Sequence, residues 1–176
     1  MDEGIFISSS KKDASKVFEY WSDEEVTRYM NIEPFTTLYQ AESMIALLQS
    51  LTKEGKATRY AIRLKTSDEI IGTCGLNRID YVKKQAEIGY DLGRPFWKKG
   101  LMTEALCLLL EKAFEEFHIQ EIEAKVDPNN KDSIILLKKF SFQLEEAYES
   151  DDCNCLYTVN KKKVSAILSG RSKGKK

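Results

Sequence analysis

Residues 86–106 hold the densest group of residues that could do chemistry. The stretch AEIGYDLGRPFWKKGLMTEAL runs from an alternating strand through a turn containing Gly93 and Gly100 into a helix. The first helical turn presents unpaired backbone N–H groups and the positive end of the helix dipole, so such a turn can bind a phosphate or pyrophosphate. Lys98 and Lys99 add positive charge there. It is neither a G-x-x-x-x-G-K-[ST] nor a G-x-G-x-x-G loop. A plain strand-to-helix turn with solvated lysines is the alternative.

The elements that must position this turn follow from hydrophobic periodicity. Helical spacing covers residues 13–21, 22–30, 37–53, 103–117 and 129–140, and strand alternation covers 59–65, 69–79, 85–92, 119–126, 142–149 and 153–159. Short polar joints make the first three strands an antiparallel meander, whereas a helical crossover makes 85–92 and 119–126 parallel neighbours. The sequence therefore predicts an α+β fold, with a mixed, mostly antiparallel central sheet and helices on both faces.

Composition and charge set the broad class. The chain has 176 residues, 42% of them hydrophobic and 31% charged, which fits one domain over residues 1–159. No apolar run approaches the roughly 18 residues of a membrane span, and the start lacks a secretory signal, so we expect a cytoplasmic protein. Residues 160–176 carry seven basic residues and no acid, which predicts a disordered basic tail. Because the formal net charge is -1, the remaining body carries -8.

The sequence has few residues that could form a metal centre or a catalytic Ser-His or Cys-His pair. His118 is the only histidine, so a metal centre and catalytic Ser-His or Cys-His pairs are not expected. The only close cysteine pair is Cys153 and Cys155, and we expect free thiols. We also expect no membrane and no direct nucleic-acid partner.

Four blocks at matching separations resemble the GNAT superfamily of acyl-CoA-dependent N-acetyltransferases. The blocks are FEYWSDEEVTRYM, AEIGYDL, WKKGLMTEAL and VDPNNKDSIILLKKFSF. Within the superfamily they are most similar to the RimJ/RimL type, which acetylates the N-termini of ribosomal proteins. The resemblance covers roughly residues 13–159 and implies that acetyl-CoA lies in the splay between the two parallel strands.

Three positions depart from the family pattern. The superfamily loop is [QR]-x-x-G-x-[GA], and residues 97–102 keep only its central Gly100. Lys98 replaces a glycine of the subgroup's W-G-K-G, so the loop amides can bind phosphate provided that Lys98 does not need a positive φ. Met102 fills the final small position. Ser141 stands where K-x-G-F has glycine, and a left-handed helix cap costs a non-glycine residue about 1 kcal/mol.

The resemblance also implies which residues hold the co-substrate, acetyl-CoA. Backbone groups of two strand residues pair with pantetheine, loop N–H groups bind the pyrophosphate, and two residues of the next helix flank the thioester. These residues are Tyr90, Leu92, Trp97, Lys98, Lys99, Gly100, Leu101, Met102, Thr103, Asn130 and Ser133. The amine attacks the thioester directly, and a backbone N–H near Tyr90 stabilises the oxyanion. No metal takes part.

Two proton tasks follow from this reaction, because a protonated amine is no nucleophile and a thiolate leaves more easily beside a donor. The resemblance implies Glu87 as the base, because Glu87 lies on the strand face opposite Ala86, where the family often has a carboxylate that acts directly or through water; the alternative is a solvated glutamate. The resemblance also implies Ser133 as the donor to sulfur, because it matches the family's serine; the alternative is a helix-capping hydroxyl. Tyr148 and Tyr157 are other candidate donors.

The acceptor is expected to be a cationic primary amine, in keeping with the acidic body. A protein N-terminal α-amine is the first hypothesis, and a polyamine or aminoglycoside is the second. A non-catalytic acyl-CoA sensor is the alternative from another class, because Lys98 and Met102 depart from the loop pattern. The oligomeric state stays open, although many relatives form homodimers.

Overall fold

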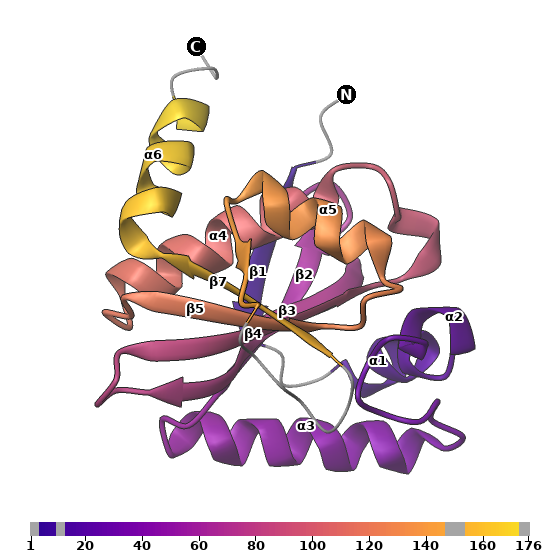
Figure 1. Cartoon of the computed structure of the whole chain (residues 1–176). Coiled ribbons are helices and arrows are strands. Elements are labelled where there is room, and N and C mark those ends of the chain that lie inside the picture. The colour runs from indigo at the N-terminus through magenta and orange to yellow at the C-terminus, as the bar shows by residue number, and fades with distance from the viewer. Residues whose placement is uncertain (1–3, 10–12, 147–153, 173–176) are drawn as a thin grey trace.

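The computed structural model describes residues 4–9, 13–146 and 154–172. Its centre is a seven-stranded sheet with the strand order β1-β2-β3-β4-β5-β7-β6 (Figure 1). The strands are β1 (Ile5–Ser9), β2 (Thr58–Leu64), β3 (Ile70–Asp80), β4 (Gln85–Leu92), β5 (Glu121–Val126), β6 (Gln143–Leu144) and β7 (Cys155–Asn160). The helices are α1 (Ala14–Trp21), α2 (Glu24–Thr27), α3 (Leu38–Lys53), α4 (Leu101–Glu115), α5 (Lys131–Lys139) and α6 (Lys161–Ser172). The expected α+β fold is confirmed.

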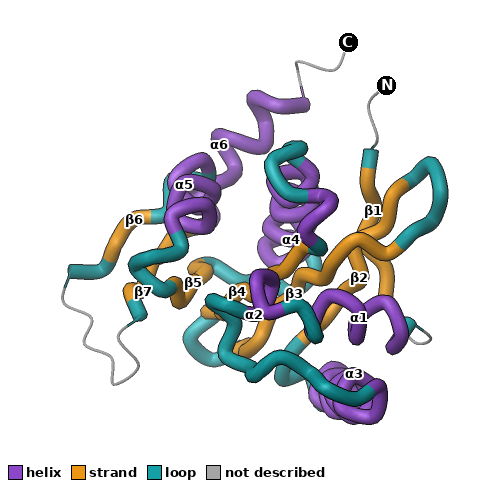
Figure 2. Tube along the Cα trace, turned by 90° about the vertical axis from the view of Figure 1, so that its right-hand side faces the viewer, coloured by secondary structure: helices purple, strands orange, loops and turns teal. Residues whose placement is uncertain are grey.

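Helices cover both faces of the sheet, as predicted. Helices α4 and α5 lie on one face, and α1, α2 and α3 lie on the other (Figure 2). Alternate β4 residues Ala86, Ile88 and Leu92 join the core under α4. The α4 leucines that meet them, Leu106, Leu109 and Leu110, are fully buried. The odd-numbered residues of β4 therefore face the side of α1 and α3.

The parallel strands β4 and β5 stay together for only part of their length. They pair from Gln85 with Glu121 to Glu87 with Glu123, and no pairing follows, although β4 runs on to Leu92 and β5 to Val126. On its other edge β4 remains paired with β3 along its whole length, antiparallel. The two strands thus separate beyond Glu87, which is the expected splay.

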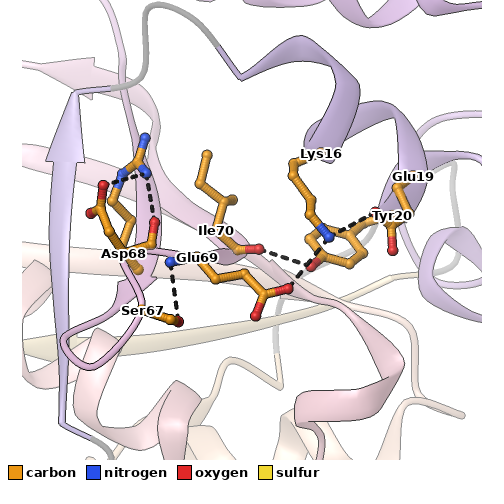
Figure 3. A network of polar contacts seen from close by, with 8 residues as sticks. Lys16, Glu19, Tyr20, Ser67, Asp68, Glu69 and Ile70 are labelled. Carbon is orange, nitrogen blue, oxygen red and sulfur yellow. Dashed lines mark hydrogen bonds and ion pairs between the residues drawn. The ribbon is translucent and has the colours of Figure 1, made fainter.

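Helix α1 is fastened to the start of β3 (Figure 3). The Tyr20 hydroxyl donates to the carbonyl oxygen of Ile70 at 2.8 Å, and the Lys16 ammonium lies 2.9 Å from Glu19 and 3.4 Å from Glu69. A Cβ atom on Gly93 would lie 2.4 Å from the Tyr20 ring, so this position after β4 requires glycine. Helix α1 therefore packs directly on the loop that follows the splay.

The expected disordered tail is wrong for residues 161–172, which form α6. Val164 is fully buried and Leu168 packs against the core, one helical turn apart. The Lys161 ammonium lies 3.0 Å from the Glu115 carboxylate. The prediction rested on the density of lysines and overlooked the two apolar residues at i and i+4 spacing. Residues 173–176 lie outside the described part of the chain.

Val164→Asp tests this packing. An unpaired carboxylate in a fully buried position is expected to lower the free energy of unfolding by roughly 3 kcal/mol. Ala166→Asp, at an exposed position of the same helix, serves as the control and should lower it by less than about 1 kcal/mol, because only helix propensity changes there. Urea unfolding of both variants decides the matter, because equal midpoints would mean that α6 does not pack on the core.

Ser141 takes the left-handed conformation expected at the end of α5, with φ at 62°. The Phe142 N–H donates to the Leu137 carbonyl at 3.2 Å and the Ser141 N–H to the Lys138 carbonyl at 3.0 Å, which is a Schellman cap. Ser141→Gly should therefore raise the free energy of unfolding by about 0.5–1 kcal/mol. Thermal unfolding should then show a midpoint higher by roughly 1–4 °C. A lower midpoint would contradict the claim that the left-handed conformation of Ser141 lowers stability.

Candidate functional site

The splay is bridged by a hydrogen bond between side chains. The Tyr90 hydroxyl, from the separated part of β4, lies 2.6 Å from the Ser133 Oγ in the first turn of α5. The Asn130 side chain caps α5 by accepting from the Ser133 N–H at 3.2 Å. Tyr90, Asn130 and Ser133 therefore meet at the splay, and the Ser133 hydroxyl bonds to Tyr90 while its backbone N–H completes the cap.

The loop between β4 and α4 contains two left-handed residues. Gly100 has φ at 79° and is the N-cap of α4, and Lys98 has φ at 59°. Lys98 therefore does adopt a positive φ, contrary to the proviso under which its replacement of glycine would leave the loop unstrained. Left-handed backbone costs a lysine roughly 1 kcal/mol, yet the loop keeps the turn that a glycine would give. The N–H groups of Leu101, Met102 and Thr103 open the helix, as the predicted anion site requires.

Trp97 and Lys99 fasten this loop. The indole Nε1 of Trp97 donates to the Leu92 carbonyl at 2.6 Å, and the Lys99 ammonium lies 5.8 Å from the centre of the Phe96 ring. The Leu92 carbonyl, expected to pair with pantetheine, thus already has an intramolecular donor. Tyr90, the other residue whose backbone is predicted to pair with pantetheine, does not take part in this hydrogen bond.

Glu87 lies on the opposite face from Ala86, as predicted, at the last position where β4 and β5 pair. Its side chain is 17% exposed, and Lys125 on β5 lies 3.6 Å from its carboxylate. Glu123, which pairs directly with Glu87, is 15% exposed and accepts from Arg78 at 3.0 Å. Glu123 was not among the predicted site residues, although the alternation of EIEAKV places it on this face.

A further polar cluster lies on the same face and was also missed. The Arg59 guanidinium donates to the Asn77 side chain at 2.6 Å and to the Gly89 carbonyl at 3.2 Å. Asp91 is buried and accepts from the Thr73 hydroxyl at 2.5 Å. Burial raises the pKa of Asp91, and the positive charge of Arg59 opposes that shift. The positive charges of Arg59 and Arg78 therefore compensate the negative charges of Asp91 and Glu123 on this face.

The remaining candidates lie elsewhere or outside the described residues. Tyr157 on β7 is buried, and burial raises its pKa, while Tyr148 and Cys153 lie in the part that is not described. His118 lines a hollow of about 210 Å³ with Tyr81 and Phe117, at the end of β4 opposite the splay. Among the described residues, no group of His, Cys, Asp and Glu could hold a metal ion, and no helix could cross a membrane.

Comparison with known proteins decides the family. The model of the acetyltransferase (GNAT) domain matches residues 5–143. The chain belongs to this family. The uncharacterised N-acetyltransferase p20 of Bacillus licheniformis is 51% identical over 134 residues, which is 76% of this chain and 75% of that protein. The expected enzyme class, an acetyl-CoA-dependent N-acetyltransferase, is thereby confirmed.

Solved structures share the GNAT fold at low sequence identity. RimJ of Mycobacterium smegmatis, in complex with CoA-disulfide, has a TM-score of 0.82 at 18% identity and covers 97% of this chain and 90% of that one. Spermidine N-acetyltransferase of Vibrio cholerae, in complex with CoA and spermine, has a TM-score of 0.78 at 15% identity. The match covers 93% of this chain and 99% of that one. The expected GNAT fold is confirmed, and these neighbours include both a RimJ protein and a spermidine N-acetyltransferase, so they do not decide the acceptor.

Proposed function

We propose that this GNAT protein transfers the acetyl group of acetyl-CoA directly to a protein N-terminal α-amine. One observation carries the proposal: β4 and β5 separate beyond Glu87, and the helix-opening loop at Gly100 follows β4 at the same end of the sheet. A thioester in the splay would then have a carboxylate on one side and a hydroxyl pair on the other.

The loop would bind the pyrophosphate of acetyl-CoA. The N–H groups from Lys98 to Thr103 supply donors at the positive end of the α4 dipole, and Lys98 and Lys99 supply charge. Pantetheine would follow the free edge of β4 near Tyr90, like an added strand. The indole of Trp97 holds the loop against the end of β4 at Leu92, which fixes the distance between these two parts of the site.

Glu87 would act as the base. An α-amine has an ordinary pKa near 7.7–8.0, so at neutral pH most of it carries the proton that must leave before attack. The Glu87 carboxylate is mostly buried and lies where the strands part, within 3.6 Å of Lys125. It would take that proton directly or through a water molecule, and a backbone N–H near Tyr90 would stabilise the oxyanion.

The charges around Glu87 support a singly charged acceptor. Two carboxylates, Glu87 and Glu123, have the cationic partners Lys125 and Arg78. A polyamine or an aminoglycoside carries several ammonium groups and is favoured by an excess of carboxylates, whereas Glu87 and Glu123 each already have a cationic partner. An N-terminus brings one charge followed by neutral peptide groups, and this face suits it better.

An acceptor panel tests the proposal. Purified protein is incubated with acetyl-CoA and basic peptides beginning with Ala, Ser or Met, or with spermidine or an aminoglycoside, and products are identified by mass spectrometry. We expect acetylation of the peptide α-amine, and none when that amine is blocked. Preferred acetylation of spermidine or the aminoglycoside would replace the proposed acceptor by a small-molecule amine.

A further inference from the structure

The hydroxyl pair of Tyr90 and Ser133 is a feature that the roles assigned so far do not explain. The two oxygen atoms lie 2.6 Å apart, and no other hydrogen-bond partner of either hydroxyl is found in the described ranges. Ser133 is 9% exposed, and Tyr90 packs against the main core. The contact is partly buried, and each hydroxyl has the other as its partner, so losing either side chain would leave the remaining hydroxyl without this hydrogen bond.

The chemistry of the two groups favours one direction of this hydrogen bond. Either oxygen can be the donor in this geometry. A phenol is a stronger acid than an aliphatic alcohol, which favours the Tyr90 O–H as the donor and the Ser133 Oγ as the acceptor. Burial raises the pKa of Tyr90 to about 12, and the phenol therefore keeps its proton throughout the working pH range. With one lone pair occupied, the Ser133 hydroxyl rotates about Cβ–Oγ under restraint, and its own proton is left to donate elsewhere.

We propose that Tyr90 is a positioning residue, which holds the Ser133 hydroxyl so that it donates to the sulfur of the departing CoA. The proposal rests on the proposed function and deepens it. The side chain of Tyr90 thus has a role separate from that of its backbone, which the family resemblance assigns to binding pantetheine.

The step balances without any change in the pair. The nitrogen lone pair forms the N–C bond, and the C–S bond breaks with its electrons going to sulfur. The ammonium gives up two protons in all: one is released to solvent through Glu87, and the other ends on the CoA thiol. Ser133 stabilises the sulfur by a hydrogen bond while its charge develops, and both hydroxyls keep their protons.

A double-mutant cycle tests the coupling. Ser133→Ala should lower kcat about 30-fold, because the donor to a developing charge is lost. Tyr90→Phe should lower kcat about 10-fold with the KM for acetyl-CoA within about twofold, since Ser133 remains but is no longer held. In the Ser133→Ala background, Tyr90→Phe should lower kcat by less than about twofold, because it then has nothing to position.

Tyr60→Phe is the matched control, since Tyr60 lies on β2 in the same row across the sheet, paired through Cys74 to Tyr90. It should leave kcat unchanged. If the loss of kcat in the double variant equals the product of the losses in the two single variants, Tyr90 does not position Ser133. The same conclusion follows if Tyr90→Phe lowers only the affinity for CoA. Either result would overturn the positioning role but not the acetyl transfer itself. A large loss of kcat in Tyr157→Phe with Ser133→Ala unaffected would move the donor to Tyr157. Wild-type protein inactive with every amine would instead overturn the proposed function.

Discussion

Glu87→Gln is expected to lower kcat/KM for a peptide amine about 100-fold near pH 6.5, the effect of removing a general base. The isosteric amide keeps the size of the side chain but cannot accept the proton. The defect should shrink toward about pH 9, because above the ordinary α-amine pKa of 7.7–8.0 most of the acceptor is already unprotonated. Initial rates of thiol release across this pH range give the ratio of the two proteins directly.

Glu121→Gln is the control for this experiment. Glu121 lies on the same face of β5, two residues before Glu123, and accepts from Gln85 at 2.6 Å. It should retain the wild-type pH profile. CoA affinity should be the same in the wild type, Glu87→Gln and Glu121→Gln. The reason is that Glu87 lies on the sheet face opposite α4, away from the loop between β4 and α4. A wild-type-to-Glu87→Gln ratio that does not change with pH would remove Glu87 as the base.

Gly100→Val is expected to weaken CoA binding about 30-fold. Gly100 has φ at 79°, a conformation that β-branched residues essentially never adopt. A Cβ atom there would meet nothing within 4 Å, so the effect comes from the backbone and not from a collision. The strained loop would turn the N–H groups at the start of α4 away from the pyrophosphate, which isothermal titration with CoA would register as a higher Kd.

Gly170→Ala provides the comparison, because Gly170 on α6 also has open space around it and has no positive φ. CoA affinity should not change in that variant. If Gly100→Val bound CoA as tightly as the wild type, the amides of this loop would not be the pyrophosphate site.

The sequence predicted the parts of the fold that local patterns control. The alternation of QAEIGYDL located β4 and the face of Glu87, and the helix that follows made β4 and β5 parallel. At the start of α3 the Gln40 side chain accepts from the Thr37 N–H at 3.0 Å, whereas the Thr37 side chain makes no cap hydrogen bond. The strand alternation and the helix cap depend on residues close together in the sequence, and the parallel arrangement follows from the single helix that connects the two strands.

What the sequence could not supply depends on contacts between distant segments. The hydrogen bond of Tyr90 with Ser133 joins positions 43 apart, and no local pattern encodes it. The positive φ of Lys98 follows from how the loop must close between β4 and α4, against the preference of a lysine. The pairing of Glu87 with Glu123 needed the register of two strands separated by a helix.

We expect this GNAT chain to catalyse acetyl transfer and not merely to bind acyl-CoA. The most direct test follows CoA thiol release from acetyl-CoA by the wild-type protein, with and without a peptide that has a free N-terminus, beside calorimetric titration of CoA. We expect CoA to bind and thiol to be released in proportion to acetylated peptide, with little release when the peptide is absent or blocked. Tight CoA binding with no thiol release for any amine would contradict catalysis and favour an acyl-CoA sensor.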